Sequence, residues 1–210
     1  MRMRASRADL ASAPARQEGP LYYYEHKFKK NAAKILPGEY LVTGEDLLMV
    51  TILGSCVAAC VWDDRRQIGG MNHFLLPDTE TAGAVSESAR YGGFAMEILV
   101  NELLKAGAAR QDLQAKVFGG GNVLQAFTKT AVGSRNAEFV REYLAAERIP
   151  IIAEDLEGIH PRKVHFFPQT GRVMVKRLPH AHETAVGQEE KAYCSRLASQ
   201  QVTGDVELFD

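Results

Sequence analysis

The chain has 210 residues, of which 46% are apolar, and this is enough to bury the core of one domain with tails on either side. Its formal net charge of −1 gives no overall electrostatic reason to expect nucleic acid or an anionic membrane surface as a partner. Three cysteines are an odd number in a chain of this length, which argues against a disulfide scaffold and fits a reducing compartment.

Residues 1–20 are rich in Arg, Ala, Ser and Pro, so we expect them to form a disordered N-terminal tail. This tail has no apolar core of the kind that a secretory signal carries, and no run elsewhere approaches the roughly 20 apolar residues of a membrane span. We therefore expect a cytoplasmic protein without membrane insertion. Residues 21–34 mix aromatic residues with lysines, and we interpret them as a segment lying on the surface of the domain.

Short apolar runs bounded by turn residues predict strands, and two longer stretches with apolar residues at three- and four-residue steps predict helices. The expected strands are 39–43, 47–53, 57–62, 68–76, 113–118, 149–153, 163–167 and 172–178, and the expected helices are 86–106 and 134–148. This mixture predicts one α/β domain over residues 21–178. Residues 179–210 form a C-terminal extension of different composition, in which we expect only a short helix over 188–197.

The candidate catalytic residues lie within residues 51–76, TILGSCVAACVWDDRRQIGGMNHFLL. Two of the expected strands are joined here by a polar turn and can pair antiparallel, which would bring Cys56 close to His73. A free thiol with a pKa of about 8.5 is a poor nucleophile at neutral pH, but a neighbouring imidazole can take its proton and leave a reactive thiolate. Gly54 and Ser55 come just before the cysteine, and backbone N–H groups in such a turn are candidate donors to a developing oxyanion.

Other interpretations of these residues stay open from their spacing alone. A free cysteine in an apolar run is more often a buried core residue than a nucleophile, and we expect Cys60 to be one. A zinc site formed by Cys56, Cys60 and His73 lacks a paired Cys-x-x-Cys signature and a fourth ligand, so no metal is expected. The glycine triplet at 119–121 matches neither the G-x-G-x-x-G motif of dinucleotide-binding proteins nor a Walker sequence, so no nucleotide cofactor is expected either.

The run LGSCVAACVWD…IGGMNHFLLP resembles the signature of the chemoreceptor glutamine deamidases, the CheD family. Further segments resemble that family in the same order: 36–43 (LPGEYLVT), 117–122 (VFGGGN), 133–137 (GSRNA), 151–155 (IIAED) and 170–176 (TGRVMVK). The resemblance covers about residues 35–178. It implies an α/β sandwich of mixed sheet layers with two main amphipathic helices, similar to the deamidase domain of cytotoxic necrotizing factor toxins.

The resemblance also implies an activity and a catalytic set. The family hydrolyses the side-chain amide of chosen glutamines on methyl-accepting chemotaxis receptors to glutamate, with a cysteine, a histidine and a threonine. By motif match these are Cys56 as nucleophile and His73 as base. Thr51 is the only threonine in the seven residues before the cysteine and is the candidate third member, although the family threonine of some members corresponds to Val50.

The resemblance further implies that no metal or organic cofactor is needed, and that the substrate is a glutamine on a helical receptor coiled coil. A CheC-type phosphatase is an expected partner, and nucleic acid is not. Two alternatives stay open: a non-catalytic chemotaxis adaptor that binds receptors or CheC through the same surface, and a zinc-dependent hydrolase that uses Cys56 and His73 as ligands.

Overall fold

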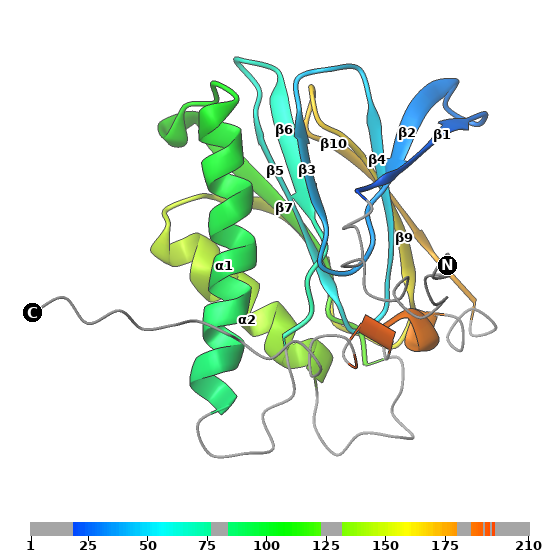
Figure 1. Cartoon of the computed structure of the whole chain (residues 1–210), viewed down its shortest axis with the longest axis vertical. Coiled ribbons are helices and arrows are strands. Elements are labelled where there is room, and N and C mark those ends of the chain that lie inside the picture. Colours follow the sequence, from blue (N-terminus) through cyan, green and yellow to red (C-terminus); the bar gives the residue numbers. More distant parts are fainter. Residues whose placement is uncertain are drawn as a thin grey trace, which may run out of the picture.

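The computed structural model describes residues 19–76, 84–122, 132–179 and 186–190, together with residues 192, 193 and 195; residues 84–90 are described by their backbone alone. Two five-stranded sheets lie face to face, and the two long helices lie side by side on the outer face of one of them (Figure 1). The described chain is therefore a three-layer arrangement of helices, sheet and sheet.

The first sheet has the strand order β1-β2-β4-β9-β10. Its strands are β1 (Leu21–Glu25), β2 (Lys30–Lys34), β4 (Leu48–Leu53), β9 (Arg162–Phe167) and β10 (Arg172–Arg177). β2 and β4 pair parallel, and the other neighbours pair antiparallel.

The second sheet has the order β3-β6-β5-β7-β8 and carries the helices. Its strands are β3 (Tyr40–Thr43), β6 (Ile68–Asn72), β5 (Val57–Asp63), β7 (Leu113–Gly119) and β8 (Ile151–Leu156). The helices are α1 (Ala84–Lys105) and α2 (Val132–Ala146), with a short 3-10 turn at Arg110–Asp112. Only β7 and β8 pair parallel in this sheet.

Strand β5 lies at the centre of the second sheet and is buried on both faces. Val57, Ala59 and Val61 pack under the helices, while Ala58 and Cys60 face the first sheet. Successive side chains of a strand point to opposite faces, so a continuous apolar run is what a strand covered on both sides requires. The core between the two sheets is the layer in which Cys56 lies.

The expected α/β sandwich with two main helices is confirmed. The interpretation of residues 21–34 as a surface segment is wrong, because β1 and β2 form an antiparallel hairpin at the edge of the first sheet, and β2 pairs with β4. The expected strand 149–153 begins and ends later, as β8. Residues 1–18 of the expected tail at 1–20 lie outside the described residues, as do residues 77–83. No helix within the described ranges is long and apolar enough to cross a membrane.

Candidate active site

Cys56 follows a tight turn that links the two sheets. Strand β4 of the first sheet ends at Leu53, the chain turns through Gly54 and Ser55, and β5 of the second sheet begins at Val57. The cysteine is fully buried and belongs to the core between the sheets. Its side chain therefore points inward, toward the opposite sheet.

His73 lies on the strand next to the cysteine, on the same face. Val57 and Phe74 exchange two backbone hydrogen bonds of 2.9 Å, which fixes the antiparallel register just beyond β6. In this register His73 is diagonal to Cys56, and diagonal neighbours have Cα atoms roughly 7–8 Å apart, within reach of long side chains. The expected hairpin of β5 and β6 is confirmed, and it brings both side chains into the layer between the sheets.

Thr51 reaches the histidine from the first sheet. Its Oγ1 lies 2.8 Å from Nδ1 of His73 and donates a hydrogen bond of 2.7 Å to the carbonyl oxygen of Ile35. A threonine hydroxyl has a single proton, and here that proton is donated to the carbonyl oxygen of Ile35. Oγ1 can therefore only accept a hydrogen bond from the ring, so Nδ1 carries a proton. The same carbonyl lies 3.4 Å from Nδ1 and can only accept. This network assigns the proton to Nδ1 and leaves the lone pair of His73 on Nε2.

The imidazole of His73 is held in its neutral form. It is 2% exposed, and this burial lowers its pKa to about 4, with the positive charge of Lys34 acting in the same direction. Nε2 is buried and has no hydrogen-bond partner within the described part of the chain. At neutral pH the ring is therefore a base with an unoccupied nitrogen.

Strand alternation places the two candidates for the third residue on opposite faces of the first sheet. Thr51 points between the sheets, whereas Val50 packs in a cluster on the outer face of the first sheet, with Tyr23 and Phe28. His165 pairs with Val50 in register, and its ring lies 5.1 Å from that of Phe28, so this histidine belongs to the same outer face.

The glycine loop after β7 supports the turn that carries the cysteine. The backbone N–H of Gly120 donates to the carbonyl oxygen of Cys56, and that of Gly121 to the carbonyl oxygen of Gly54, both at 2.7 Å. Gly119 has a φ of 107°, and a Cβ atom there would collide with the carbonyl oxygen of Cys56. These glycines therefore lie beside the turn that carries the cysteine.

We expect Gly119→Ala to disrupt the turn at the cysteine, because the substitution adds both backbone strain and a collision with Cys56. The variant should unfold at a urea midpoint well below that of the wild type. Gly93→Ala is the matched control, since a Cβ there meets nothing within 4 Å. Equal midpoints for the Gly119 variant and the wild type would show that the loop does not depend on this glycine.

Asn136 of α2 supports the same turn from the helix layer. It is fully buried, its Nδ2 donates to the carbonyl oxygen of Ser55 at 2.8 Å, and its Oδ1 accepts from the backbone N–H of Leu76 at 3.0 Å. The two hydrogen bonds tie the cysteine turn to the end of the histidine strand.

Replacing Asn136 with alanine should lower the free energy of unfolding by roughly 1–3 kcal/mol, because two buried backbone groups lose their partners. Urea unfolding measures this change, and Glu138→Ala, an exposed position on the same helix, serves as control. A loss no larger than that of the control would contradict the bracing role.

Glu190 also contacts this turn, although it comes from the C-terminal extension. Its Oε1 accepts from the backbone N–H groups of Gly54 at 3.1 Å and Cys56 at 3.0 Å, and its Oε2 accepts from Oγ of Ser55 at 2.6 Å. The side chain is buried, with the residue 6% exposed. Sequence reasoning missed this residue, because a glutamate in a polar segment gives no signal of burial. The contact shows that two backbone N–H groups of the cysteine turn converge on one oxygen atom.

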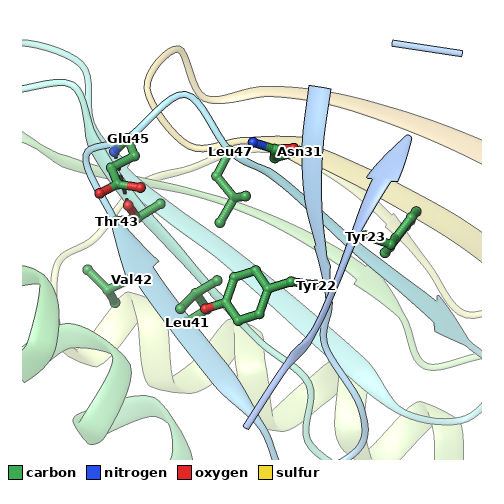
Figure 2. Close-up of a pocket in the computed structure, with 8 residues that line it drawn as sticks. All are labelled: Tyr22, Tyr23, Asn31, Leu41, Val42, Thr43, Glu45 and Leu47. Carbon is green, nitrogen blue, oxygen red and sulfur yellow. Dashed lines mark hydrogen bonds between the residues drawn. The ribbon is translucent and has the colours of Figure 1, made fainter. Parts of the chain in front are cut away.

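The remaining candidates lie apart from this cluster. Cys60 is buried in the core, and burial raises the pKa of its thiol. The residues that the structure describes include no group of three or more His, Cys, Asp or Glu side chains able to hold a metal ion. A groove of about 600 Å³ opens elsewhere, between the β1–β2 edge, β3 and the turn before β4 (Figure 2). None of the cysteine, histidine or threonine candidates lines it.

The chain is similar to proteins of named function. Residues 75–177 match the family described as CheD chemotactic sensory transduction. A protein of Xanthomonas campestris pv. campestris (strain B100) named "Probable chemoreceptor glutamine deamidase CheD" is 59% identical over 188 residues, covering 90% of this chain and 94% of that protein. Proteins of the same name from Janthinobacterium sp. (strain Marseille) and Thiobacillus denitrificans are 56% identical over 189 residues and 54% identical over 202 residues.

These matches cover 89% and 95% of this chain, and 93% and 100% of the two relatives. The similarity thus extends beyond residues 35–178, the part of the chain that the motif resemblance covers. Among solved structures, a hypothetical protein YfiH of Bacillus licheniformis aligns with a TM-score of 0.36 and 15% identity, over 65% of this chain and 59% of that one. This structural likeness is too low to bear on the fold or the site.

Proposed function

The chain belongs to the CheD family of chemoreceptor glutamine deamidases, and from this membership we propose that it is a protein-glutamine glutaminase acting on chemotaxis receptors. It hydrolyses the side-chain amide of specific glutamines on methyl-accepting chemotaxis proteins, which gives glutamate and ammonia. The observation that carries the proposal is the pairing of a buried cysteine with a neutral histidine on neighbouring strands, in a chain more than half identical to proteins of that name.

The proposed reaction proceeds through a thioester. Nε2 of His73 takes the thiol proton of Cys56, and the thiolate attacks the carboxamide carbon of the substrate glutamine. The backbone N–H groups of Gly54 and Cys56 stabilise the oxyanion, a role supported by their convergence on one carboxylate oxygen. His73 returns the proton to the departing amine, which leaves as ammonia. Water, deprotonated by His73, then hydrolyses the thioester to glutamate and regenerates the thiol.

Thr51 positions the imidazole in this scheme. Its hydroxyl holds Nδ1–H of His73 in the tautomer that presents the Nε2 lone pair to the thiol. We expect Thr51→Val to lower kcat/KM by roughly 10- to 100-fold, a loss no larger than the low end of what a general base usually contributes. The ring loses its nearer acceptor and keeps only the carbonyl oxygen of Ile35 at 3.4 Å. Thr51→Ser keeps the hydroxyl and should restore most of the rate. A pH–rate profile should change in Thr51→Val and not in Thr51→Ser; unchanged profiles in both would contradict the assignment.

The substrate and partners follow from the family. Receptor glutamines lie on helical coiled coils, so the site must accept a side chain presented by a helix. We place the reaction in the cytoplasm, with no metal or organic cofactor in the scheme. The partnership with a CheC-type phosphatase rests on the family resemblance and stays a prediction, as does the kinship with the toxin deamidase domain.

Incubation with the cytoplasmic domain of a receptor from the same cell tests the proposal. We expect release of ammonia and an increase in receptor mass equal to the replacement of amide NH₂ by acid OH. The receptor domain incubated alone supplies the rate of spontaneous deamidation. Stable binding of the receptor without ammonia release would favour the adaptor interpretation instead.

A further inference from the structure

The proposed nucleophile and base are not accessible to a macromolecular substrate in this structure. Cys56 has no exposed surface, and His73 is 2% exposed. A receptor helix cannot place a glutamine side chain on a thiol that is sealed in this way. Some element that covers the turn must therefore leave before the reaction begins, and the described residues of the C-terminal extension are in direct contact with it.

We propose that this C-terminal segment (residues 186–190, 192, 193 and 195) is an intramolecular product mimic that occupies the place of the substrate glutamine, so that the site opens only when it leaves. The inference rests on the proposed deamidase function. The segment would then regulate access to the site, and its contacts indicate how a substrate side chain is held.

The chemistry of Glu190 is that of the reaction product. Deamidation of a glutamine leaves a γ-carboxylate on a side chain of the same length, which is what a glutamate provides. The Glu190 carboxylate accepts both backbone N–H groups assigned to the oxyanion, and its second oxygen accepts from Ser55. Hydrogen bonds to an ionised acceptor are stronger than those between neutral groups, so the contact holds the segment in place.

The backbone of the segment also resembles a helical substrate. Residues 186–190 are helical, so a helix already lies against the cysteine turn. Val186, one helical turn before Glu190, packs on the backbone of Gly54, where an added Cβ would lie 3.0 Å from the valine Cγ1. A receptor helix is expected to use the same approach, with an apolar residue four positions before its glutamine.

A second contact extends the cover to the histidine side of the site. Tyr193 is buried in the core cluster that contains Cys56, and its ring lies on Gly38, where an added Cβ would be 2.6 Å from the ring. The backbone N–H of Gly38 in turn donates to the carbonyl oxygen of His73 at 2.7 Å. The segment thus contacts both the turn that carries the nucleophile and the turn next to the base.

An attached segment competes strongly with a free substrate. Its effective concentration at the site is set by the chain that links it, on the order of millimolar for short flexible links. The apparent affinity for a receptor helix is then reduced by the fraction of molecules in which the segment is displaced. Weakening the Glu190 contact should therefore raise both access to the thiol and the rate on receptor.

Alkylation of Cys56 by iodoacetamide, followed by peptide mapping, tests access without relying on activity. In full-length Glu190→Ala we expect alkylation of Cys56 to be roughly tenfold faster or more than in the wild type, in proportion to the open fraction. Glu189→Ala is the matched control, because it removes a carboxylate from the neighbouring position, where it pairs with Lys34 at the surface with 48% of its side chain exposed. Cys60, buried in the core, is the internal standard for intact folding.

Val186→Asp should weaken the binding of the segment to the cysteine turn through a different contact, because it places a second carboxylate beside Glu190. This variant should also accelerate alkylation of Cys56.

Kinetics on the receptor domain supply the second readout, with a higher kcat/KM expected for Glu190→Ala and no change for Glu189→Ala. If the wild type deamidates the receptor while alkylation and kcat/KM are the same in Glu190→Ala, the product-mimic proposal is wrong and the proposed function stands. If alkylation accelerates in Glu190→Ala and Val186→Asp but no protein releases ammonia, the segment covers the thiol and the proposed function fails.

Discussion

Cys56→Ala is expected to reduce ammonia release from the receptor domain to the spontaneous rate. The thiol forms the only covalent bond between protein and substrate in the proposed scheme, and losing a catalytic nucleophile typically costs on the order of 10⁴- to 10⁶-fold in kcat. Receptor binding should persist, because the substitution removes a single buried sulfur and leaves the backbone N–H groups of the turn in place.

Cys60→Ala is the matched control for this prediction. It makes the same chemical change four residues along the chain, at a buried thiol whose pKa is raised by burial and whose strand partners in register are Met71 and Lys116. We expect the control to keep the wild-type rate, with at most a modest loss of stability from the small cavity. Activity that persists in Cys56→Ala, or that is lost equally in both variants, would exclude Cys56 as the specific nucleophile.

His73→Gln is expected to lower kcat by roughly 10²- to 10⁴-fold, the usual contribution of a positioned acid–base group. Glutamine keeps a polar group near Thr51 but cannot take the thiol proton at neutral pH. His165→Gln, on the outer face of the first sheet, is the control and should retain the rate. A His73→Gln variant with an unchanged rate would mean that another group activates the thiol.

The same variant should change how stability depends on pH. Folding lowers the pKa of His73 from its ordinary 6.5 to about 4 by burial. Below pH 6.5 the unfolded chain therefore binds a proton that the folded chain excludes, so stability is lost as the pH falls from 6.5 toward 4. Over this window the loss amounts to about 3 kcal/mol from this residue. Urea unfolding at several pH values should show a shallower decline in His73→Gln, and parallel curves would contradict the assigned pKa.

The pairing of Cys56 with His73 was predictable because it depends on local pattern. Two apolar runs joined by a polar turn fold back on each other, and their register needs no information from the rest of the chain. The position of Thr51 beside His73 was less predictable, because it depends on how one sheet packs on the other. Sequence spacing left Thr51 and Val50 open, and the alternation of side chains along β4 separates them.

Glu190 could not be found from the sequence. It lies 134 residues from Cys56 in the chain, and a carboxylate in a polar helical stretch has the pattern of a solvated surface residue. Its burial is explained by three hydrogen-bond donors of the cysteine turn, which are brought to the carboxylate only by the tertiary fold. The β1–β2 hairpin was missed for a related reason: edge strands expose one face, so Tyr22 and Tyr24 remain exposed and the stretch lacks the apolar signal of a core strand.

The proposed reaction passes through a covalent thioester between Cys56 and the receptor glutamine, and hydroxylamine can intercept this intermediate. A thioester reacts with hydroxylamine to give a hydroxamate on the former glutamine and a free thiol, whereas direct attack of water on the amide gives only glutamate. Peptide mapping of the receptor after reaction with the wild type in hydroxylamine should find the hydroxamate at the modified positions, and none with Cys56→Ala. Glutamate without hydroxamate at those positions, formed equally by both proteins, would contradict the thioester mechanism.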